Sequence, residues 1–236
     1  MAFHNNPRIV TDSIALCLDA NAASSYSGSG STWTDLAQDL SFNAQGTQTP
    51  FTTAGGAKCF QFNNSGWWRC NSGFSQVDMA GACTLIMWVY ATDLTERDTI
   101  FEKAGTTYNS YEQEIAVTYE PAENFSWYSR QGSYDYGSTS AMTTNAWNMM
   151  GIKMSTGKIA GTSRSGYYSK NGANWTSNYT VRSTNAITTA GEIRVGNGYA
   201  GVVESGYIAQ VLVYEKELTN SEILQNFNAQ KSRFGL

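Results

Sequence analysis

A strand that is apolar on both faces, residues 206–214, constrains the fold of this chain more than any other part of the sequence. Alternation along it places Ile208, Gln210, Leu212 and Tyr214 on one face. The opposite face is apolar or aromatic throughout, and Gln210 is the one polar side chain after Gly206. A strand with two apolar faces needs cover on both sides, so we expect it in the centre of a sheet.

An amphipathic helix is predicted directly after this strand. Thr219 and Glu222 have the spacing of a capping box, in which each side chain satisfies a backbone N–H group at the helix start. Ile223, Leu224 and Phe227 then form a narrow apolar stripe along one side of the helix. The stripe predicts a closing helix that docks on a sheet formed elsewhere in the chain.

The partner of the late strand is predicted near the start of the sequence. Residues 13–20 alternate, with Ile14, Leu16 and Leu18 expected on one face. Because chain ends often lie close together in a single domain, we expect this strand beside residues 206–214.

The rest of the chain predicts many short strands with little helix between them. We expect strands at residues 58–63, 67–70, 82–91, 98–103, 111–119, 124–130, 147–154, 166–171, 178–183 and 192–197. Loops are expected at residues 24–32, 106–110, 131–144 and 170–177, and Trp33 is expected to anchor the first of them. This pattern predicts an all-β fold, an antiparallel β-sandwich with one short C-terminal helix near residues 219–230. The predicted domain spans residues 13–236 after an N-terminal arm, residues 1–12.

Charge and hydropathy exclude several classes of partner. The formal net charge is −4 and the pI is near 5.0, with scattered Lys and Arg, so we expect no nucleic-acid partner. The longest apolar run, residues 85–91, is about a third of a membrane span, so we expect no membrane insertion. The first eight residues contain no apolar leader core, which predicts synthesis and retention in a cytosol. Cys17, Cys59, Cys70 and Cys83 lack metal-site spacing, and buried thiols are favoured over a disulfide or a metal site.

Taken together, these segments resemble the laminin-G-like, concanavalin A-like jelly roll found in virion proteins of tailed bacteriophages, including cyanophages. The matching segments are residues 16–20, 25–30, 33–36, 60–62, 84–89, 100–103, 147–150, 193–196 and 206–236. The resemblance implies a virion structural protein, such as a capsid decoration protein or a neck or tail adaptor. Such a protein would be made in the cytoplasm of the bacterial host and would contact other virion proteins in multiple copies. The same sandwich hosts lectins, so the alternative is a carbohydrate-binding module that recognises host surface glycans.

Enzymatic chemistry is not expected. The one histidine, His4, lies in the predicted arm, which leaves no positioned imidazole for a catalytic triad. Glu112 and Glu114 share a strand face, but related sandwich hydrolases carry three acids there, and this segment has two. We therefore expect an exposed acidic strand rather than a glycosidase.

A structural calcium ion is the one cofactor that the resemblance suggests, because relatives of laminin-G domains bind calcium at loop carboxylates. Asp19 and Asp35 are the weak candidate ligands, with Asp93 and Asp98 at other loop edges. None belongs to a dense cluster with calcium-ligand spacing, so a turn or capping role is favoured.

Aromatic residues in the middle of the chain are the candidate binding or interface residues. Tyr134, Tyr136 and Trp175 fall in segments that look like turns, where burial is difficult, and Tyr108 and Tyr168 lie in or beside predicted loops. Aromatic rings there can stack on sugars or anchor a protein interface.

Overall fold

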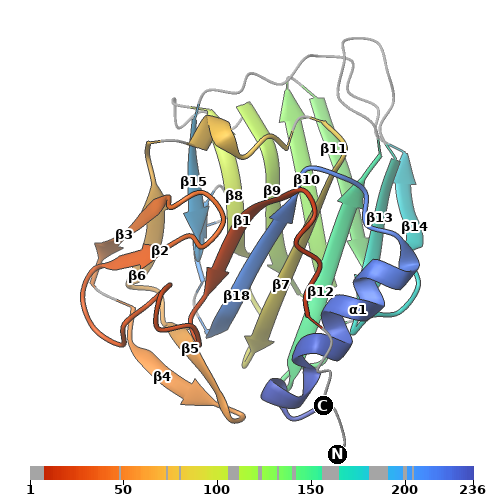
Figure 1. The fold of residues 1–236 in the computed structure, drawn as a ribbon. Coiled ribbons are helices and arrows are strands. Elements are labelled where there is room, and N and C mark those ends of the chain that lie inside the picture. The colour runs from red at the N-terminus through yellow and green to blue at the C-terminus, as the bar shows by residue number, and fades with distance from the viewer. Residues whose placement is uncertain are drawn as a thin grey trace, which may run out of the picture.

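The computed structural model describes most of the chain. It covers residues 8–47, 49–72, 74–79, 81–105, 112–121, 124–131, 133–139, 142–155, 165–180, 191–198, 201–203 and 205–236. Two eight-stranded antiparallel sheets pack face to face, and one helix lies on the outside of the first sheet (Figure 1).

The first sheet, called sheet A, contains the late strand that the sequence singles out. Its order is β14 (Thr176–Thr180), β13 (Ser165–Lys170), β12 (Trp147–Met154), β7 (Cys83–Ala91), β18 (Gly206–Tyr214), β5 (Ala57–Phe62) and β4 (Phe51–Ala54). The eighth strand, β1 (Ile14–Asp19), pairs with β18 on the same side as β5, and Cys17 lies opposite Leu212. The predicted pairing of the early and late strands is therefore confirmed.

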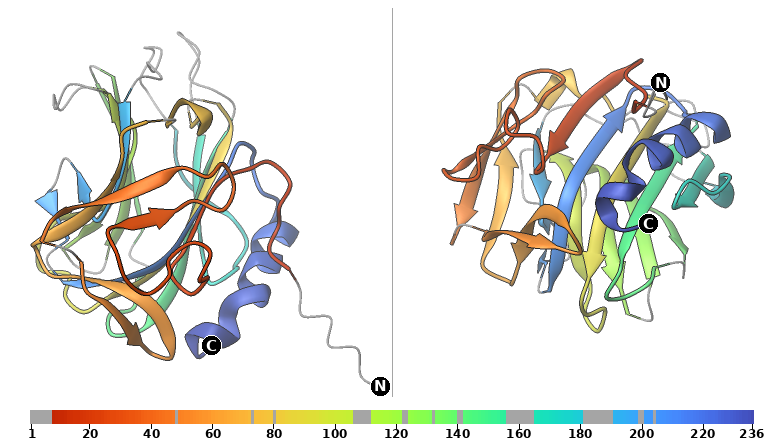
Figure 2. Two further views of the ribbon diagram at one scale, coloured as in Figure 1. Left: turned by 60° about the vertical axis from the view of Figure 1, so that its left-hand side comes forward. Right: turned by 60° about the horizontal axis from the view of Figure 1, so that its bottom comes forward.

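The second sheet, called sheet B, forms the other layer of the sandwich (Figure 2). Its order is β11 (Ser133–Thr139), β10 (Asn124–Gln131), β9 (Glu112–Glu120), β8 (Asp98–Gly105), β15 (Gly191–Val195), β6 (Gly66–Cys70), β3 (Ser41–Gly46) and β2 (Thr32–Thr34). A short hairpin of β16 (Asn197–Gly198) and β17 (Gly201–Val202) makes a small third sheet.

The core between the two sheets is rich in aromatic rings. Trp33 is fully buried there, with its ring centroid 4.7 Å from that of Phe60 and 5.9 Å from that of Trp68. Tilted and edge-on contacts of this kind add to the gain from apolar burial. Trp33 thus anchors its loop, as predicted.

A second apolar layer lies between sheet A and the helix. Ile86 and Trp88 of β7 point outward into it, whereas Leu85 and Met87 point toward sheet B. The Trp88 ring stacks on the ring of Phe234 with centroids 3.8 Å apart. Cover on both sides explains why β7 and β18 are apolar on both faces.

Irregularities in the pairing correct the predicted faces of both terminal strands. The register of β18 shifts between Ile208 and Gln210, so Ile208 faces sheet B while Leu212 and Tyr214 face the helix. A similar shift in β1 separates Ile14 from Leu16. A bulge adds one residue to a strand and therefore reverses the alternation beyond it, which simple periodicity does not detect.

The helix, α1 (Asn220–Gln230), begins at the predicted capping box. The Thr219 side chain accepts from the Glu222 N–H at 3.2 Å, and Glu222 Oε2 accepts from the Thr219 N–H at 2.8 Å. Ile223 is fully buried and Phe227 partly buried, but Leu224 is 46% exposed, so its place in the apolar stripe was wrong. The side of the helix that faces the sheet instead includes the polar residues Asn226 and Gln230, which are buried.

The last part of the predicted arm, around Val10, docks on the domain. The Val10 N–H donates to Asn226 Oδ1 at 2.8 Å, and the Tyr214 hydroxyl donates to the Val10 carbonyl at 3.0 Å. Asn226 Nδ2 contacts the same hydroxyl at 3.2 Å. These bonds fasten the segment to α1 and β18, and residues 1–7 lie outside the described residues.

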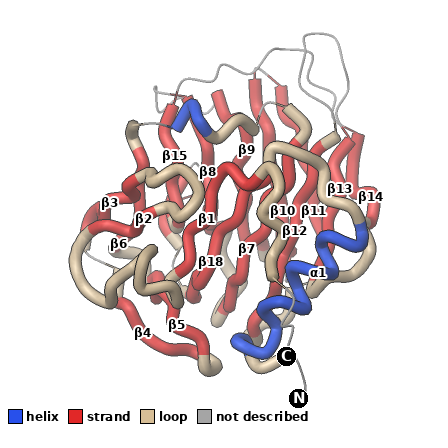
Figure 3. Tube along the Cα trace, viewed as in Figure 1, coloured by secondary structure: helices blue, strands red, loops and turns tan. Residues whose placement is uncertain are grey.

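Several strands differ from the prediction, as the tube in Figure 3 makes visible. The segments β2, β3 and β4 were not predicted, and β11 lies inside the predicted loop at residues 131–144. Beyond the strands, Lys231–Phe234 forms a 3₁₀ turn after α1, and Phe74–Gln76 forms another before β7. Within the described residues, no helix is both long and apolar enough to span a membrane.

The four cysteines are buried as thiols, in agreement with the favoured expectation. Cys17 and Cys59 lie in the layer under the helix and Cys70 and Cys83 in the core between the sheets. Burial raises the pKa of Cys17 to about 12 and that of Cys59 to about 12. Such thiols are poor nucleophiles, because the thiolate is the reactive form.

Candidate functional site

The outer face of sheet B carries a cluster of aromatic and charged side chains around β6. In this strand Trp68 and Cys70 point into the core, so Trp67 and Arg69 point outward. Trp67 is partly buried, and the Arg69 side chain is 35% exposed.

The neighbouring strand β15 completes the cluster. Ile193 and Val195 point into the core, which turns Glu192 and Arg194 outward beside β6. Arg194 lies directly opposite Arg69 in the register. On the other side of β6, Asn43 lies opposite Arg69 and Gln45 lies opposite Trp67. We call this set, Asn43, Gln45, Trp67, Arg69, Glu192 and Arg194, the Trp67 face.

Ion pairs fix the position of Arg194. Its Nε donates to Glu192 Oε1 at 2.5 Å, its Nη2 contacts the same oxygen, and its Nη1 lies 3.3 Å from Glu102 Oε2. The β16–β17 hairpin covers this pair, and an added Cβ at Gly198 would lie 2.6 Å from Glu102 Oε2. Arg194 and Glu102 are consequently almost fully buried.

The two guanidinium groups also contact the ring of Trp67. The Cζ atoms of Arg69 and Arg194 lie 5.9 Å and 5.6 Å from the centre of the Trp67 ring. Cation–π contacts of this kind hold an indole in place. The result is a fixed aromatic plate with guanidinium, carboxylate and amide groups around it, and these groups can stack on and hydrogen-bond to a polyhydroxylated ligand.

A small open cavity of about 320 Å³ lies beside the predicted loop at residues 24–32. Its lining consists of Tyr26, Gly28, Ser29, Gly30, Thr49, Pro50 and Phe51. Gly28 and Gly30 have φ values of 100° and 98°, which favour glycine and shape the rim. The Thr49 hydroxyl is buried without a hydrogen-bond partner and closed to solvent. The cavity lining therefore includes backbone groups and two aromatic rings, and no charged side chain.

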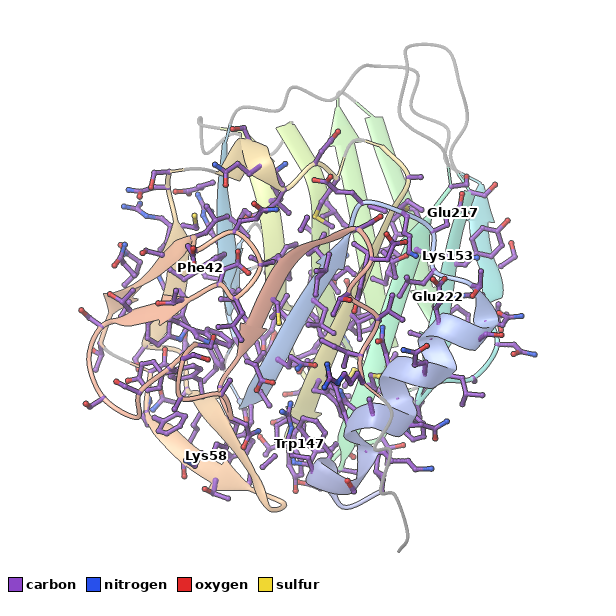
Figure 4. All side chains as sticks on the ribbon, viewed as in Figure 1. Phe42, Lys58, Trp147, Lys153, Glu217 and Glu222 are labelled. Atoms are coloured by element: carbon purple, nitrogen blue, oxygen red, sulfur yellow. The ribbon has the colours of Figure 1, made fainter. Side chains whose placement is uncertain are left out.

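Trp175 occupies a different environment from the one expected of a turn residue. It is partly buried against the layer under α1, and its backbone N–H donates to Asn220 Oδ1 at 3.0 Å. Gly151 makes room for the ring, since an added Cβ there would lie 3.0 Å from Trp175 Cη2. Lys153 Nζ lies 5.3 Å from the ring centre and 3.9 Å from Glu217 Oε2, near the start of the helix (Figure 4). Trp175 thus anchors the β13–β14 turn to the helix, and an interface role for it stays a prediction.

The other predicted aromatic residues do not gather around Trp175. Tyr168 is partly exposed and lies opposite Ile152, which faces sheet B, so it is on the other side of sheet A from Trp175. Tyr134 and Tyr136 lie in strand β11 rather than in a turn, opposite Arg130 and Tyr128, and their side chains are outside the described set. Tyr108 lies outside the described residues.

Asp19 and Asp35, the weak candidates for calcium, are occupied by donors from the protein. Asp19 accepts from Gln210 Nε2 at 2.9 Å, from Arg233 Nη1 at 2.8 Å and from the Asn21 N–H at 2.8 Å. Asp35 accepts from the backbone N–H groups of residues 17, 37 and 38 at 2.6–3.0 Å. Burial raises the pKa of Asp35, and these backbone bonds oppose that rise. Both residues therefore act in turns and packing, and within the described ranges no group of three or more metal-ligating residues gathers.

Glu112 and Glu114, the acidic pair considered for glycoside hydrolysis, lie on β9. The backbone of residues 112–114 belongs to this strand, and the side chains of Glu112 and Glu114 are outside the described set.

The sequence interpretation missed the Trp67 face, although one signal was present. Residues 67–70 alternate between outward and inward positions, and the outward ones are tryptophan and arginine rather than small polar residues. A tryptophan with an arginine beside it on the solvent side of a strand is a candidate for binding.

Comparison with known structures gives the class of fold. The chain resembles the receptor binding domain of a botulinum neurotoxin C/D mosaic serotype, with a TM-score of 0.68 and 14% identity over 94% of this chain and 52% of that one. It resembles the botulinum neurotoxin serotype C1 binding domain with a TM-score of 0.69 and 12% identity, over 92% of this chain and 52% of that domain. It also resembles a Trypanosoma rangeli sialidase in complex with the inhibitor DANA, with a TM-score of 0.63 and 15% identity. That match covers 95% of this chain and 34% of the sialidase.

These likenesses establish a concanavalin A-like sandwich of two antiparallel sheets with one C-terminal helix. The chain spans about half the length of the toxin binding domains and about a third of the sialidase. No family model matches the sequence, and no curated protein sequence matches it.

Proposed function

We propose that this domain is a non-enzymatic carbohydrate-binding module and that its binding site is the Trp67 face. The observation that carries the proposal is the Trp67 indole, held by two guanidinium groups on a sheet face that the helix does not cover. Protein sites for sugars need an aromatic plane for the C–H face of the ring and fixed polar groups for its hydroxyls. The Trp67 face supplies both.

The fold supports this proposal more than it supports a purely structural role. One resembling toxin domain is described as a receptor binding domain and another as a binding domain, and a sandwich of this shape makes up about half of each. Because fold alone does not fix function, the proposal depends on the side chains of the Trp67 face.

A glycan array tests the proposal directly. The intact protein is expected to bind at least one class of glycan, and Trp67→Ala is expected to abolish that binding while the domain stays folded. Tyr207→Ala is the matched control, because Tyr207 is also partly buried but lies on the outer face of sheet A. Absence of any glycan binding by the intact protein, or equal binding by the Trp67 variant, would overturn the assignment.

We further propose, from the sequence resemblance, that the module is displayed on a phage particle. In that setting it would be made in the bacterial cytoplasm and held in multiple copies by capsid, neck or tail proteins, with no nucleic-acid partner and no membrane insertion. Peptide mass spectrometry and cryo-electron microscopy of purified particles test this. Particles that lack the chain contradict the virion setting and leave the binding assignment intact.

A further inference from the structure

We propose that the Trp67 face selects sugars that carry a carboxylate, and that Arg69 is the residue that recognises the acidic group. This inference rests on the proposed glycan binding and goes beyond it by naming the ligand class. The two arginines of the face differ in how fully their donors are used, and that difference carries the argument.

Arg194 has little spare capacity for a ligand, because its side chain is almost fully buried. All three of its guanidinium nitrogens contact carboxylate oxygens of Glu192 or Glu102, and its side chain is 8% exposed. Its role is to fix Glu192 and to support the Trp67 ring.

Arg69 has that capacity. Within the described part of the chain, its ion pair is with Glu192 Oε2 at 3.6 Å, which is longer than a hydrogen bond. Glu192 is meanwhile held by Arg194 through its other oxygen. The planar donor fork of Arg69 is therefore available from the solvent side, where 35% of the side chain is exposed.

The spacing of Trp67 and Arg69 suits one sugar ring. Residues two apart on a strand lie on the same face about 7 Å apart. A pyranose that stacks on the indole can place an equatorial carboxylate over the neighbouring guanidinium. A carboxylate matches the guanidinium fork with two parallel hydrogen bonds, which a neutral hydroxymethyl group does not.

The surrounding charge favours an anion at this position in particular. Glu192 and Glu102 both approach Arg194, so the positive charge of Arg69 is the least compensated on the face. The whole chain has a formal net charge of −4, so attraction of an acidic sugar must come from this local charge. Binding of the acidic ligand should then weaken as salt rises, while stacking of a neutral sugar should change little.

The experiment compares matched pairs of glycans on the intact protein. Each neutral glycan is paired with the same glycan in which the terminal sugar carries a carboxylate, and the best pair is then measured by titration calorimetry at two salt concentrations. We expect roughly 10- to 100-fold tighter binding of the carboxylate form. Arg69→Gln should remove this preference, and Arg69→Lys should retain part of it.

Arg97→Gln is the control, because Arg97 is an exposed arginine paired with Glu120 at another part of sheet B. Equal binding of both members of each pair, with Trp67 still required, would overturn carboxylate selection and leave glycan binding standing. A stronger preference for sulfated counterparts would also overturn it. If the intact protein binds none of the glycans, both this inference and the proposed function are overturned.

Discussion

The outer faces of the two sheets are built from the same kind of alternating strand but meet different surroundings. On sheet A the outward side chains include Ile86, Trp88 and Leu212, and α1 with the docked N-terminal segment covers them. On sheet B, around β6 and β15, the outward side chains are Trp67, Arg69, Glu192 and Arg194, and within the described residues the short β16–β17 hairpin covers the side where Arg194 meets Glu102.

This difference separates residues that stabilise the domain from residues that are available to a ligand. A tryptophan under the helix gains from burial and stacking, so its removal should affect folding. A tryptophan that is only partly buried, with two arginines over its ring, loses less burial when it is removed, so its removal should affect binding more than folding. The two faces thus give two matched tryptophans with opposite expected phenotypes.

The largest expected effect comes from the covered face. Trp88→Ala removes a fully buried ring that stacks on Phe234 and should lower the free energy of unfolding by about 3–5 kcal/mol. Trp67→Ala should change it by less than about 1 kcal/mol. Urea denaturation of both variants measures the contrast, and equal losses would contradict the division between the two faces.

The polar bonds that hold the N-terminal segment should give the next largest effect. Asn226→Ala leaves the Val10 N–H without its side-chain acceptor and should cost about 1–3 kcal/mol. Hydrogen exchange at Val10 should rise in this variant, since its amide would lose protection. Exchange that stays unchanged would mean that apolar contacts alone hold the segment.

Alkaline pH should lower the free energy of unfolding, because the layer under the helix contains two thiols with raised pKa values. Cys17 and Cys59 have a pKa of about 12 in the folded protein, against about 8.5 in an unfolded chain. Between these pH values the unfolded chain releases protons that the folded chain retains, so the free energy of unfolding falls as pH rises above about 8.5. Urea denaturation at pH 7 and pH 9.5 checks this.

The double variant Cys17→Ala, Cys59→Ala is the control for that measurement, and its alkaline loss should be smaller. Thiol labelling of the native protein at pH 8 should be slow at all four cysteines and fast after unfolding. Rapid native labelling would show that these sites open more often than their burial indicates.

Acid should have a smaller effect at the start of the helix. Burial favours the neutral form of Glu222, but hydrogen bonds from Lys216 and Thr219 outweigh it and hold the pKa below its usual value. A lowered pKa stabilises the fold above about pH 4.3, and this contribution is lost as pH falls through the folded pKa. Glu222→Gln keeps a capping side chain and should remove this part of the acid dependence, by about 0.5–1 kcal/mol. If the variant shows the same dependence of stability on acid pH, Glu222 does not contribute to that dependence.

The smallest expected effect is at Leu224, which the sequence predicts in the apolar stripe of the helix. Leu224→Ala should change stability by less than about 0.5 kcal/mol, because the side chain is exposed. Ile223→Ala, one position earlier, should cost about 2–5 kcal/mol. A large loss at Leu224 would show that the helix packs differently from the structure.

The fold was predictable where apolar side chains decide it. Strands β7 and β18 are apolar on both faces and β12 is mostly so, and their burial is therefore evident from composition and length. Strand β3 escaped prediction because Phe42 is its one fully buried side chain, and the others are polar or small. The bulge in β18 could not be read either, since it arises from pairing with β7 rather than from local preference.

The candidate site was less predictable than the fold. Trp67 and Arg69 become part of a site only because β15 brings Glu192 and Arg194 beside them from more than a hundred residues away. Trp175, which looked exposed in a turn, is partly buried because Gly151 on another strand leaves space for its ring. Register between distant strands decides both cases, and no local pattern contains that information.

The position of β18 between β7 and β1 has a consequence for how the protein is made. Residues 14–19 and 83–91 leave the ribosome well before residues 206–214, which form the strand that pairs with both of them. At about 5–20 residues per second, the centre of sheet A stays open for several seconds to tens of seconds after its neighbours emerge. During that interval the apolar edges of β1 and β7 are exposed to other chains, so yield in cells should depend on chaperones and on translation speed through the last third of the message.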